Sequence, residues 1–511
     1  MSVTSTGSTV AALIDSFTGA APDRRDDEYQ RLVGALWNDG ELTDLAVPAV
    51  PVLMARLTEA DDAHKGYLAV LLGLLIEGEF PATDGPVTTA VRSGVAGYTA
   101  LWSTSTKGEP LSLALQYLLS HFPDSREPIL AVANGLDLDE DDLSRLDRAL
   151  RQLDQENPNL GRVFPSPAVW NLDESEREFD RTWINSLTPD QVLAAWRHDT
   201  RTVLGHTGAK AYWAVQNGAP AAWSTDSVPP RTGAAPESDN SIFEQHGDAF
   251  RCPDCGDALR FEPGGARCAS CSMAYPVTGG ILNLTAGVRS TSDGPGDFQF
   301  KLAEMPSMGF FYEAYARPNF LRLCGSNWGE QVSPTDEDDY IIEQVRPVDG
   351  PVLDLAAGAG RWTEVLAKAV GSERLIALDL NPPMLSVLRG RLPDIPAVLV
   401  SAKTLPFEDE SLGAVLCWNA LQAFPQDAPA AIAEVGRCLR PGGTFSFLTF
   451  RNSDDPIYRY FVGSHHFPQH SGGLHLFELQ DILDWVAAAG LTITEQSGPG
   501  TFVFITAERP R

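Results

Sequence analysis

The first part of the chain carries apolar residues at three- and four-residue spacing. Such spacing lines one face of a helix with hydrophobic side chains, so each amphipathic stretch predicts a helix. Polar breaks such as Pro123-Asp124-Ser125 separate the stretches. We therefore expect residues 1–217 to form a helical domain, with helices at residues 26–37, 47–57, 64–77, 110–122 and 140–153.

The stretches at residues 50–57 and 66–76 flank an acidic turn, and this pair loosely resembles HEAT-like repeats. An array of such repeats offers a surface for a protein partner. Any helical bundle would share the periodicity, and the domain would then be a stabilising appendage. Both interpretations of residues 1–217 stay open at this point.

Short apolar runs replace the helical pattern in the second half of the chain. Val352–Leu355 and Leu375–Asp379 have the length and character of buried strands, and a helix is expected between them at residues 361–369. Strand, helix and strand in this order predict an α/β domain, to which we assign residues 288–511.

Two segments of other composition lie between these domains. Residues 218–246 begin with a stretch rich in Ala, Pro, Ser and Thr, which is typical of a flexible linker. Residues 247–287 contain Cys252-Pro253-Asp254-Cys255 and, after twelve residues, Cys268-Ala269-Ser270-Cys271. Two such pairs can surround one tetrahedral ion with four thiolates, and closed sites of this kind are structural zinc sites. The alternative is two disulfides, although nothing else indicates an oxidising compartment.

The turn after the strand at Val352–Leu355 has the features of a ligand site. Gly358 and Gly360 allow a sharp turn in which no Cβ blocks the approach of a ligand to the backbone. The following helix points its N-terminus at the same place and favours an anionic group. Asp379 ends the next strand, where its carboxylate can accept hydrogen bonds from both hydroxyls of a ribose.

These features predict a nucleotide-type cofactor site, with S-adenosylmethionine as the best candidate. A dinucleotide site is the rival interpretation, but Thr363 stands where the third glycine of Gly-x-Gly-x-x-Gly would be. Two downstream segments favour the first interpretation. They are LPFEDESLGAVLC at residues 405–417, which runs from a turn into a strand, and LRPGGTFSF at residues 439–447, with a Pro-Gly-Gly turn before another strand.

Taken together, residues 340–510 resemble the class I S-adenosylmethionine-dependent methyltransferases, in particular the branch related to quinone biosynthesis. The resemblance implies a Rossmann-like fold with a mostly parallel seven-stranded sheet and a lid segment before it. The implied cofactor contacts are Asp354, Ala356, Gly358 and Gly360 at the methionine end, Asp379 and Leu380 at the ribose, Ser401 and Ala402 at the adenine, and Asn419 beneath the sulfonium.

Three positions depart from the family pattern. Ala356 stands where the family often has its first glycine, and Gly413 where it usually has an acid before the fourth strand. Ser401 replaces an acid next to the adenine and so removes an acceptor for the adenine amino group.

Residues 274–281 resemble the small zinc ribbon found beside or fused to methyltransferases, which is similar to the activator subunit of tRNA and release-factor methyltransferases.

The substrate side of the site is predicted from two segments. Phe310, Phe311, Tyr312, Tyr315 and Phe320 lie where relatives carry a lid helix, although ordinary core packing explains such spacing equally well. His465, His466, His470 and His475 lie in a loop that falls where class I enzymes cover the acceptor. A neutral imidazole suits a general base, for which we favour His475 or His466. The alternatives are a second metal site, structural hydrogen bonding, and transfer that needs no base because positioning carries most of the rate.

The acid excess of the chain limits its partners. The formal net charge is −30 with a pI near 4.6, and such a chain repels phosphate backbones unless it has a local basic patch. This argues against an rRNA methyltransferase with a zinc ribbon. The longest apolar stretch, residues 67–76, is too short to span a bilayer, and the first ten residues do not resemble a signal peptide. We expect a cytoplasmic protein without membrane contacts.

The resulting hypothesis is a methyltransferase that uses S-adenosylmethionine and a structural Zn²⁺ ion. It would transfer a methyl group by in-line displacement to an oxygen, nitrogen or carbon atom of a small-molecule acceptor, secondary metabolites included. One alternative is an rRNA methyltransferase, or a protein methyltransferase whose helical domain docks the target protein. The other is a non-catalytic adaptor with a methyltransferase-like domain, which the residues at Ser401 and Gly413 favour.

Overall fold

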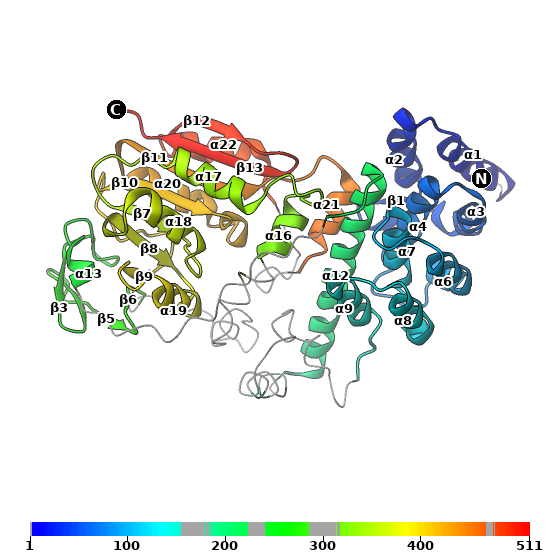
Figure 1. Cartoon of the computed structure of the whole chain (residues 1–511), viewed down its shortest axis with the longest axis horizontal. Coiled ribbons are helices and arrows are strands. Elements are labelled where there is room, and N and C mark those ends of the chain that lie inside the picture. The colour runs from blue at the N-terminus through cyan, green and yellow to red at the C-terminus, as the bar shows by residue number, and fades with distance from the viewer. Residues whose placement is uncertain are drawn as a thin grey trace. The chain divides into compact units, whose positions relative to one another are not determined.

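The computed structural model describes residues 3–154, 178, 182, 185, 187–222, 241–285, 313, 317–466, 474 and 476–511 (Figure 1). The chain forms two compact units. The helical unit comprises Met1–Ser166, Asp180–Trp223 and Ser453–Leu474, and the sheet unit comprises Pro167–Phe179, Ser224–Asn452 and His475–Arg511. Among the described helices, none combines the length and the apolar character needed to cross a membrane.

The helical unit contains the predicted helices and further ones. The five predicted helices correspond to α2 (Arg25–Leu36), α3 (Ala46–Glu59), α4 (Asp62–Glu77), α7 (Pro110–Leu119) and α9 (Glu140–Ala149). The others are α1 (Val3–Thr18), α5 (Pro86–Arg92), α6 (Val95–Ser103), α8 (Arg126–Gly135), α12 (Pro189–Asn217) and α21 (Pro456–Gly463), with a small ribbon of β1 (Trp37–Asn38) and β2 (Glu41–Leu42).

Helix α4 is the core of this unit. All of its residues from Gly66 to Glu77 are buried, and it packs against α3, α7 and α12. Gly73 allows close approach of α7, because a Cβ at this position would lie 2.3 Å from the ring of Tyr117. The capping box of Thr188 and Gln191 fixes the start of α12.

The segment Ser453–Leu474 joins the helical unit although it lies late in the chain. Its helix α21 packs on α12, where Gly208 leaves room for the ring of Phe461. Asp455 caps α21 and accepts hydrogen bonds from Tyr212 (2.7 Å), Gln216 (3.0 Å) and Gln30 (3.1 Å). The range 288–511, predicted as one domain, is thus interrupted by a segment whose polar and apolar partners are in the first 217 residues.

The sheet unit is built on eleven strands in the order β12-β13-β11-β10-β7-β8-β9-β6-β5-β4-β3. Its central strands pair in parallel, whereas β13 pairs antiparallel with β11 and β12. Seven strands form the α/β part: β7 (Val352–Leu355), β8 (Leu375–Asp379), β9 (Ala397–Leu399), β10 (Leu412–Trp418), β11 (Leu439–Phe450), β12 (Thr492–Ser497) and β13 (Phe502–Glu508). This agrees with the predicted seven-stranded, mostly parallel sheet.

Helices accompany the strands of this sheet in Figure 1. Two of them, α17 and α18, contact each other, as do α20 and α22. The described helices of the unit are α13 (Ser241–Glu244), α16 (Arg317–Cys324), α17 (Pro334–Gln344), α18 (Arg361–Val370), α19 (Pro382–Arg391), α20 (Ala428–Cys438) and α22 (Leu479–Ala488).

The cysteine-containing segment continues the same sheet. Its strands are β3 (Leu259–Glu262), β4 (Gly265–Cys268), β5 (Ala274–Thr278) and β6 (Ile281–Asn283), and β6 pairs in parallel with β9. A second attachment comes from the backbone, where Arg251 donates to Pro406 (2.8 Å) and Glu408 donates to Ala249 (2.9 Å). One hydrophobic core runs from Phe250 and Leu282 to Leu353 and Ile376. The segment is therefore an integral part of the sheet unit.

Candidate functional site

The predicted cofactor residues lie at one edge of the sheet. The strands β9, β8, β7 and β10 are neighbours and run in parallel, so their carboxyl ends meet at the same edge. Asp354 is in β7, Asp379 ends β8, Ser401 lies two residues after β9, and Asn419 directly follows β10. Ligands of open α/β sheets bind outside such carboxyl ends. The structure thus brings the predicted residues together, and their individual contacts with a cofactor stay predictions.

The turn between β7 and α18 uses the left-handed backbone region three times. Ala356 has φ +59°, Gly358 φ +56° and Gly360 φ +88°. Glycine adopts this region freely, whereas alanine pays about 1–2 kcal/mol there because its Cβ crowds the carbonyl oxygen. The departure at Ala356 therefore keeps the turn geometry at a cost in stability.

Asp379 links this turn to the end of β8. Its Oδ2 accepts a hydrogen bond from the backbone N–H of Gly358 (2.8 Å), and its Oδ1 accepts one from Asn381 (2.8 Å). Burial raises the pKa of Asp379, and the backbone donors oppose that effect. Each carboxylate oxygen has a second lone pair, so the group can still accept a hydrogen bond from a ligand.

Asp354 is buried beneath the same turn, with 2% of its surface exposed. Desolvation raises its pKa to about 7, the negative charge of Asp379 adds to this, and a hydrogen bond from the Thr363 hydroxyl counteracts it. Thr363 is in the first turn of α18 and is itself completely buried. The sequence analysis noted Thr363 only because it replaces a glycine. Its position nine residues after Asp354 is the feature of the sequence from which this contact could have been inferred.

The side chains predicted beside the ribose and the adenine are accessible. Leu380 is 60% exposed, which is unusual for a residue that follows a buried strand. Ser401 and Ala402 are half-buried, and the Ser401 hydroxyl accepts a hydrogen bond from the backbone of Lys403 (3.3 Å). An exposed apolar side chain beside the half-buried carboxylate of Asp379 suits a ligand that has a flat apolar part and a polar part.

Asn419 is held firmly at the end of β10. It is 3% exposed with φ +54°, its N–H donates to Leu448 (3.0 Å), and its Oδ1 accepts from the amide of Gln422 (2.7 Å). Gln422 in turn accepts from Thr449 (3.1 Å). The Nδ2 of Asn419 has no hydrogen-bond partner among the described residues. Buried polar groups are usually paired, so this donor is available to a ligand.

Charged residues that the sequence analysis missed surround this edge of the sheet. Glu337 of α17 is completely buried, accepts a hydrogen bond from the indole of Trp418 (2.8 Å) and pairs with Arg317 (3.3 Å). Glu313 is 6% exposed and pairs with Arg391 of α19 (2.6 Å). These partners are 81, 20 and 78 positions apart in the chain, so local motifs carry no signal for them.

The two histidines predicted as bases have different positions. His475 lies outside the described residues, as do Phe310, Phe311, Tyr312 and Tyr315 of the predicted lid. His466 belongs to the helical unit, is 8% exposed, and stacks on His198 with 4.4 Å between ring centroids. Its backbone N–H donates to Thr202 of α12 (3.0 Å). The role of a histidine as general base stays a prediction.

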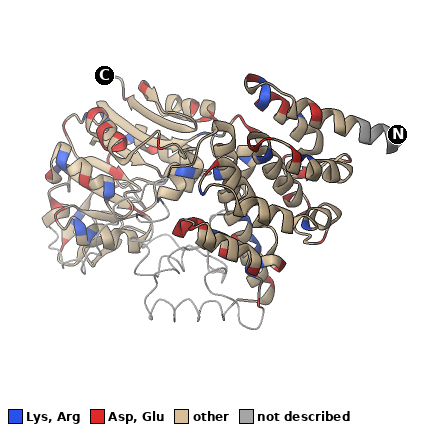
Figure 2. Cartoon of the chain, turned by 45° about the vertical axis from the view of Figure 1, so that its right-hand side comes forward, with Lys and Arg blue, Asp and Glu red and all other residues tan. Residues whose placement is uncertain are grey.

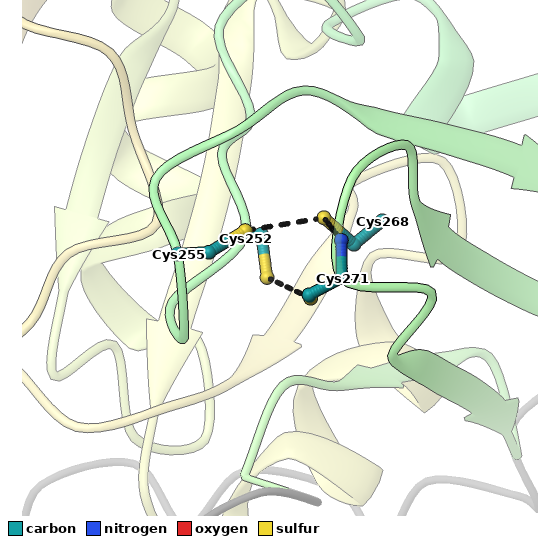
Figure 3. Close-up of side chains that lie close together, drawn as sticks. All are labelled: Cys252, Cys255, Cys268 and Cys271. Atoms are coloured by element: carbon teal, nitrogen blue, oxygen red, sulfur yellow. Dashed lines mark hydrogen bonds between the residues drawn. The ribbon is translucent and has the colours of Figure 1, made fainter.

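The four cysteines of the two Cys-x-x-Cys pairs converge on one point (Figure 3). Their sulfur atoms lie within 4.8 Å of one another, with 3.7 Å between Cys252 and Cys271 and 3.3 Å between Cys255 and Cys268. A tetrahedral ion with Zn–S bonds of 2.3 Å requires about 3.8 Å between sulfurs, and a disulfide requires about 2.05 Å. The backbone N–H groups of Ser270 (3.4 Å) and Cys271 (3.5 Å) point to Cys268 Sγ, which stabilises a thiolate. The donor set therefore fits a zinc ion.

Comparisons with known proteins agree with the geometry of the sheet unit. A family described as a methyltransferase domain matches residues 352–443, from the start of β7 into β11. An uncharacterised chloroplastic methyltransferase of Arabidopsis thaliana is 29% identical over 296 residues, covering 51% of this chain and 78% of the plant protein. The ubiquinone/menaquinone biosynthesis C-methyltransferase of Burkholderia mallei is 37% identical over 118 residues, covering 22% of this chain and 48% of the bacterial protein.

Solved structures also match the chain. The crystal structure of an S-adenosylmethionine-dependent methyltransferase from Mesorhizobium loti has 19% identity and a TM-score of 0.28, and it covers 33% of this chain and 95% of the bacterial chain.

Proposed function

We propose that this S-adenosylmethionine-dependent methyltransferase transfers a methyl group to an oxygen, nitrogen or carbon atom of a small-molecule acceptor. The observation that carries the proposal is a group of three polar side chains at the carboxyl ends of three adjacent strands, the buried Asp354 and Asn419 and the half-buried Asp379. The cofactor, when bound, supplies an electrophilic methyl group on a sulfonium. The protein has to bind it, orient it and exclude water.

Each of these side chains has a separate task in the proposed site. Asp379 would accept hydrogen bonds from the ribose hydroxyls while it keeps its bonds to Gly358 and Asn381. Asp354, which is costly to ionise where it lies, would be stabilised in its charged form by the positive groups at the methionine end. Asn419 would direct its Nδ2, which has no partner in the described part of the chain, toward the cofactor from the end of β10. Positioning of this kind supplies a large part of the rate in a displacement reaction.

The charge of the chain supports a small acceptor over a nucleic acid. The net charge is −30, and Figure 2 shows acidic positions spread over the described helices and loops among fewer basic ones. A phosphate backbone would be repelled by this surface. Within the small-molecule class, the quinone-biosynthesis relative supports an aromatic or quinone-like acceptor as the first compound to test. A cytoplasmic location stays a prediction, since the name of the plant relative assigns that protein to the chloroplast.

We also infer that the cysteine cluster holds one structural zinc ion. Four thiolates complete a tetrahedral shell and leave no position for water or substrate, so the ion would stabilise the fold and take no part in the transfer. Cys252 and Cys268 are buried and Cys255 and Cys271 are exposed, which is compatible with a site at the rim of the domain.

The cofactor assignment is tested by calorimetric titration with S-adenosylmethionine and with S-adenosylhomocysteine. We expect micromolar binding that Asp379→Ala abolishes, because the substitution removes the ribose acceptor and the bond to Gly358. Asp349→Ala, an exposed carboxylate in the loop before β7, is the matched control and should bind as the unaltered protein does. Absence of binding by the folded, zinc-loaded protein would instead favour the adaptor interpretation.

The acceptor class is tested with cofactor that carries a radioactive methyl group. Cell extract is divided into small molecules, protein and RNA, and each fraction is incubated with the enzyme. We expect label to enter the small-molecule fraction, and a hydroxylated quinone should be methylated if the finer assignment is right. Label in RNA or in protein would contradict the small-molecule proposal.

A further inference from the structure

Two residues that precede the α/β part, Glu313 and Arg317, contact the surroundings of the cofactor turn through separate ion pairs. Glu313 pairs with Arg391, whose guanidinium also donates to the carbonyl of Ala359 (3.3 Å) and pairs with Glu364 (3.0 Å). Ala359 is the central residue of the Gly358–Gly360 turn, and Glu364 is in the first turn of α18. Arg391 therefore connects Glu313 to the glycine turn and to the first turn of α18, which both lie at the proposed cofactor site.

The second ion pair reaches the end of β10. Arg317 is 3% exposed and pairs with Glu337 (3.3 Å), and its guanidinium lies 5.5 Å from the ring centroid of Trp362. The other oxygen of Glu337 accepts the hydrogen bond of the Trp418 indole (2.8 Å). Trp418 directly precedes Asn419, so this chain of contacts ends at a predicted cofactor residue.

Burial distinguishes these pairs from those at the opposite edge of the sheet. The side chains of Arg317 and Glu337 are 4% and 0% exposed, and those of Arg391 and Glu313 are 15% and 6% exposed. At the amino ends of the strands the paired carboxylates are more accessible: Glu434 is 21%, Glu408 47%, Glu410 52% and Asp409 71% exposed. Buried ion pairs seldom increase stability, and where they are kept, a demand for one defined geometry is a physical reason.

We propose that Glu313 and Arg317 are positioning residues for cofactor binding. The Glu313–Arg391 pair holds the glycine turn, and the Arg317–Glu337 pair holds Trp418 and, through it, Asn419. Neither residue needs to touch the cofactor. The inference rests on the proposed cofactor site, and it predicts that affinity for S-adenosylmethionine depends on charges that lie behind the residues in contact with it.

Two variants test the pairs without leaving a buried charge alone. Glu313→Gln removes one charge, while Arg391 keeps its partners Glu364 and Ala359. The double variant Arg317→Met with Glu337→Gln removes both charges of the buried pair and keeps an acceptor for the Trp418 indole. We expect each to raise the Kd for S-adenosylmethionine by about tenfold or more, by analogy with metal sites, where loss of a group that orients a ligating residue has an effect of this size. Arg317→Lys, which keeps the charge, should bind more tightly than the double variant.

The matched control is Arg437→Met with Glu434→Gln, the same double exchange at the other edge of the same sheet. It should lower the melting temperature but leave the Kd within twofold. The inference is overturned if the unaltered protein binds cofactor and both test variants bind it equally well, whatever their melting temperatures. If the double variant does not fold, Glu313→Gln decides alone. Failure of the unaltered protein to bind would refute the proposed cofactor site, and the inference with it.

Discussion

At the scale of single residues, burial makes the carboxyl group of Asp354 costly to ionise. It is buried under the glycine turn, where it accepts a hydrogen bond from the Thr363 hydroxyl. Its folded pKa of about 7 lies above the ordinary value of 3.8, so the folded state holds a proton that the unfolded state has released. Such a group contributes stability that is fully present below the unfolded pKa and is lost as the pH rises through the folded one.

We therefore expect the free energy of unfolding to fall between about pH 4 and pH 7 by up to about 1.4 kcal/mol per pH unit from this group. Asp354→Asn should remove that slope, because the amide does not titrate and still accepts the Thr363 hydroxyl. Urea unfolding at pH 5, 6, 7 and 8 measures the difference between the two proteins. Asp349→Asn, on an exposed carboxylate, should keep the slope, and an equal slope in Asp354→Asn would refute the assignment.

Residues of the site could be predicted where their neighbours are close in sequence. Gly358, Gly360 and Asp379 belong to runs whose order alone indicates a strand, a turn and a second strand. Thr363 was considered only as a departure from another motif, although it donates to Asp354. Glu337 and Trp418 lie 81 positions apart, and their hydrogen bond forms because α17 packs on β11, the neighbour of β10, an arrangement that no local pattern encodes.

At the scale of elements too, features set by neighbouring residues could be predicted and contacts between distant segments could not. Val352–Leu355 and Leu375–Asp379 are strands with the predicted bounds, because a short apolar run ending in a turn has few other solutions. Helix α12 was not predicted. All its residues from Val203 to Tyr212 are buried, and they include His206, Thr207 and Lys210. The apolar residues of this stretch therefore do not recur at the spacing that predicts an amphipathic helix. The pairing of β6 with β9 could not be predicted from the sequence either, since it joins segments more than a hundred residues apart.

Because β6 extends the sheet from the cysteine cluster to β9, loss of the metal should loosen more than the cluster. We expect about one zinc per chain by atomic absorption, and none in Cys268→Ser. In that variant, hydrogen exchange should rise in β6 and at the adjacent edge of β9. Cys438→Ala removes a buried thiol elsewhere in the unit and should keep its zinc. A metal-free protein with two disulfides by mass spectrometry would support the alternative interpretation of the four cysteines.

At the scale of the whole molecule, the two units are not two consecutive pieces of chain. The sheet unit is interrupted after Asn452 and continues at His475, and the residues between these two positions belong to the helical unit. Helix α21 buries Ile457, Tyr458, Phe461 and Val462 there. A cut in the linker therefore does not separate the units, although the linker composition around residues 218–240 indicates a boundary.

A fragment of residues 241–511 should consequently expose the apolar face of α21. We expect it to bind a hydrophobic dye and to associate in analytical ultracentrifugation. The same fragment with residues 453–474 replaced by a Gly-Ser linker of equal length should be monomeric and should bind S-adenosylmethionine. If the first fragment is also monomeric and binds no dye, α21 does not depend on the helical unit for its burial.

The late position of α21 also has a consequence for synthesis on the ribosome. The helical unit lacks one of its helices until roughly 230 further residues have followed Trp223. At about 5–20 residues per second, this amounts to a delay of roughly 10–50 s. During that time the part of α12 around Gly208, which packs against Phe461 in the finished protein, is uncovered on the nascent chain. The helical unit begins first but stays incomplete until most of the sheet unit has been made, and the period in which it needs protection from aggregation is set by the rate of translation.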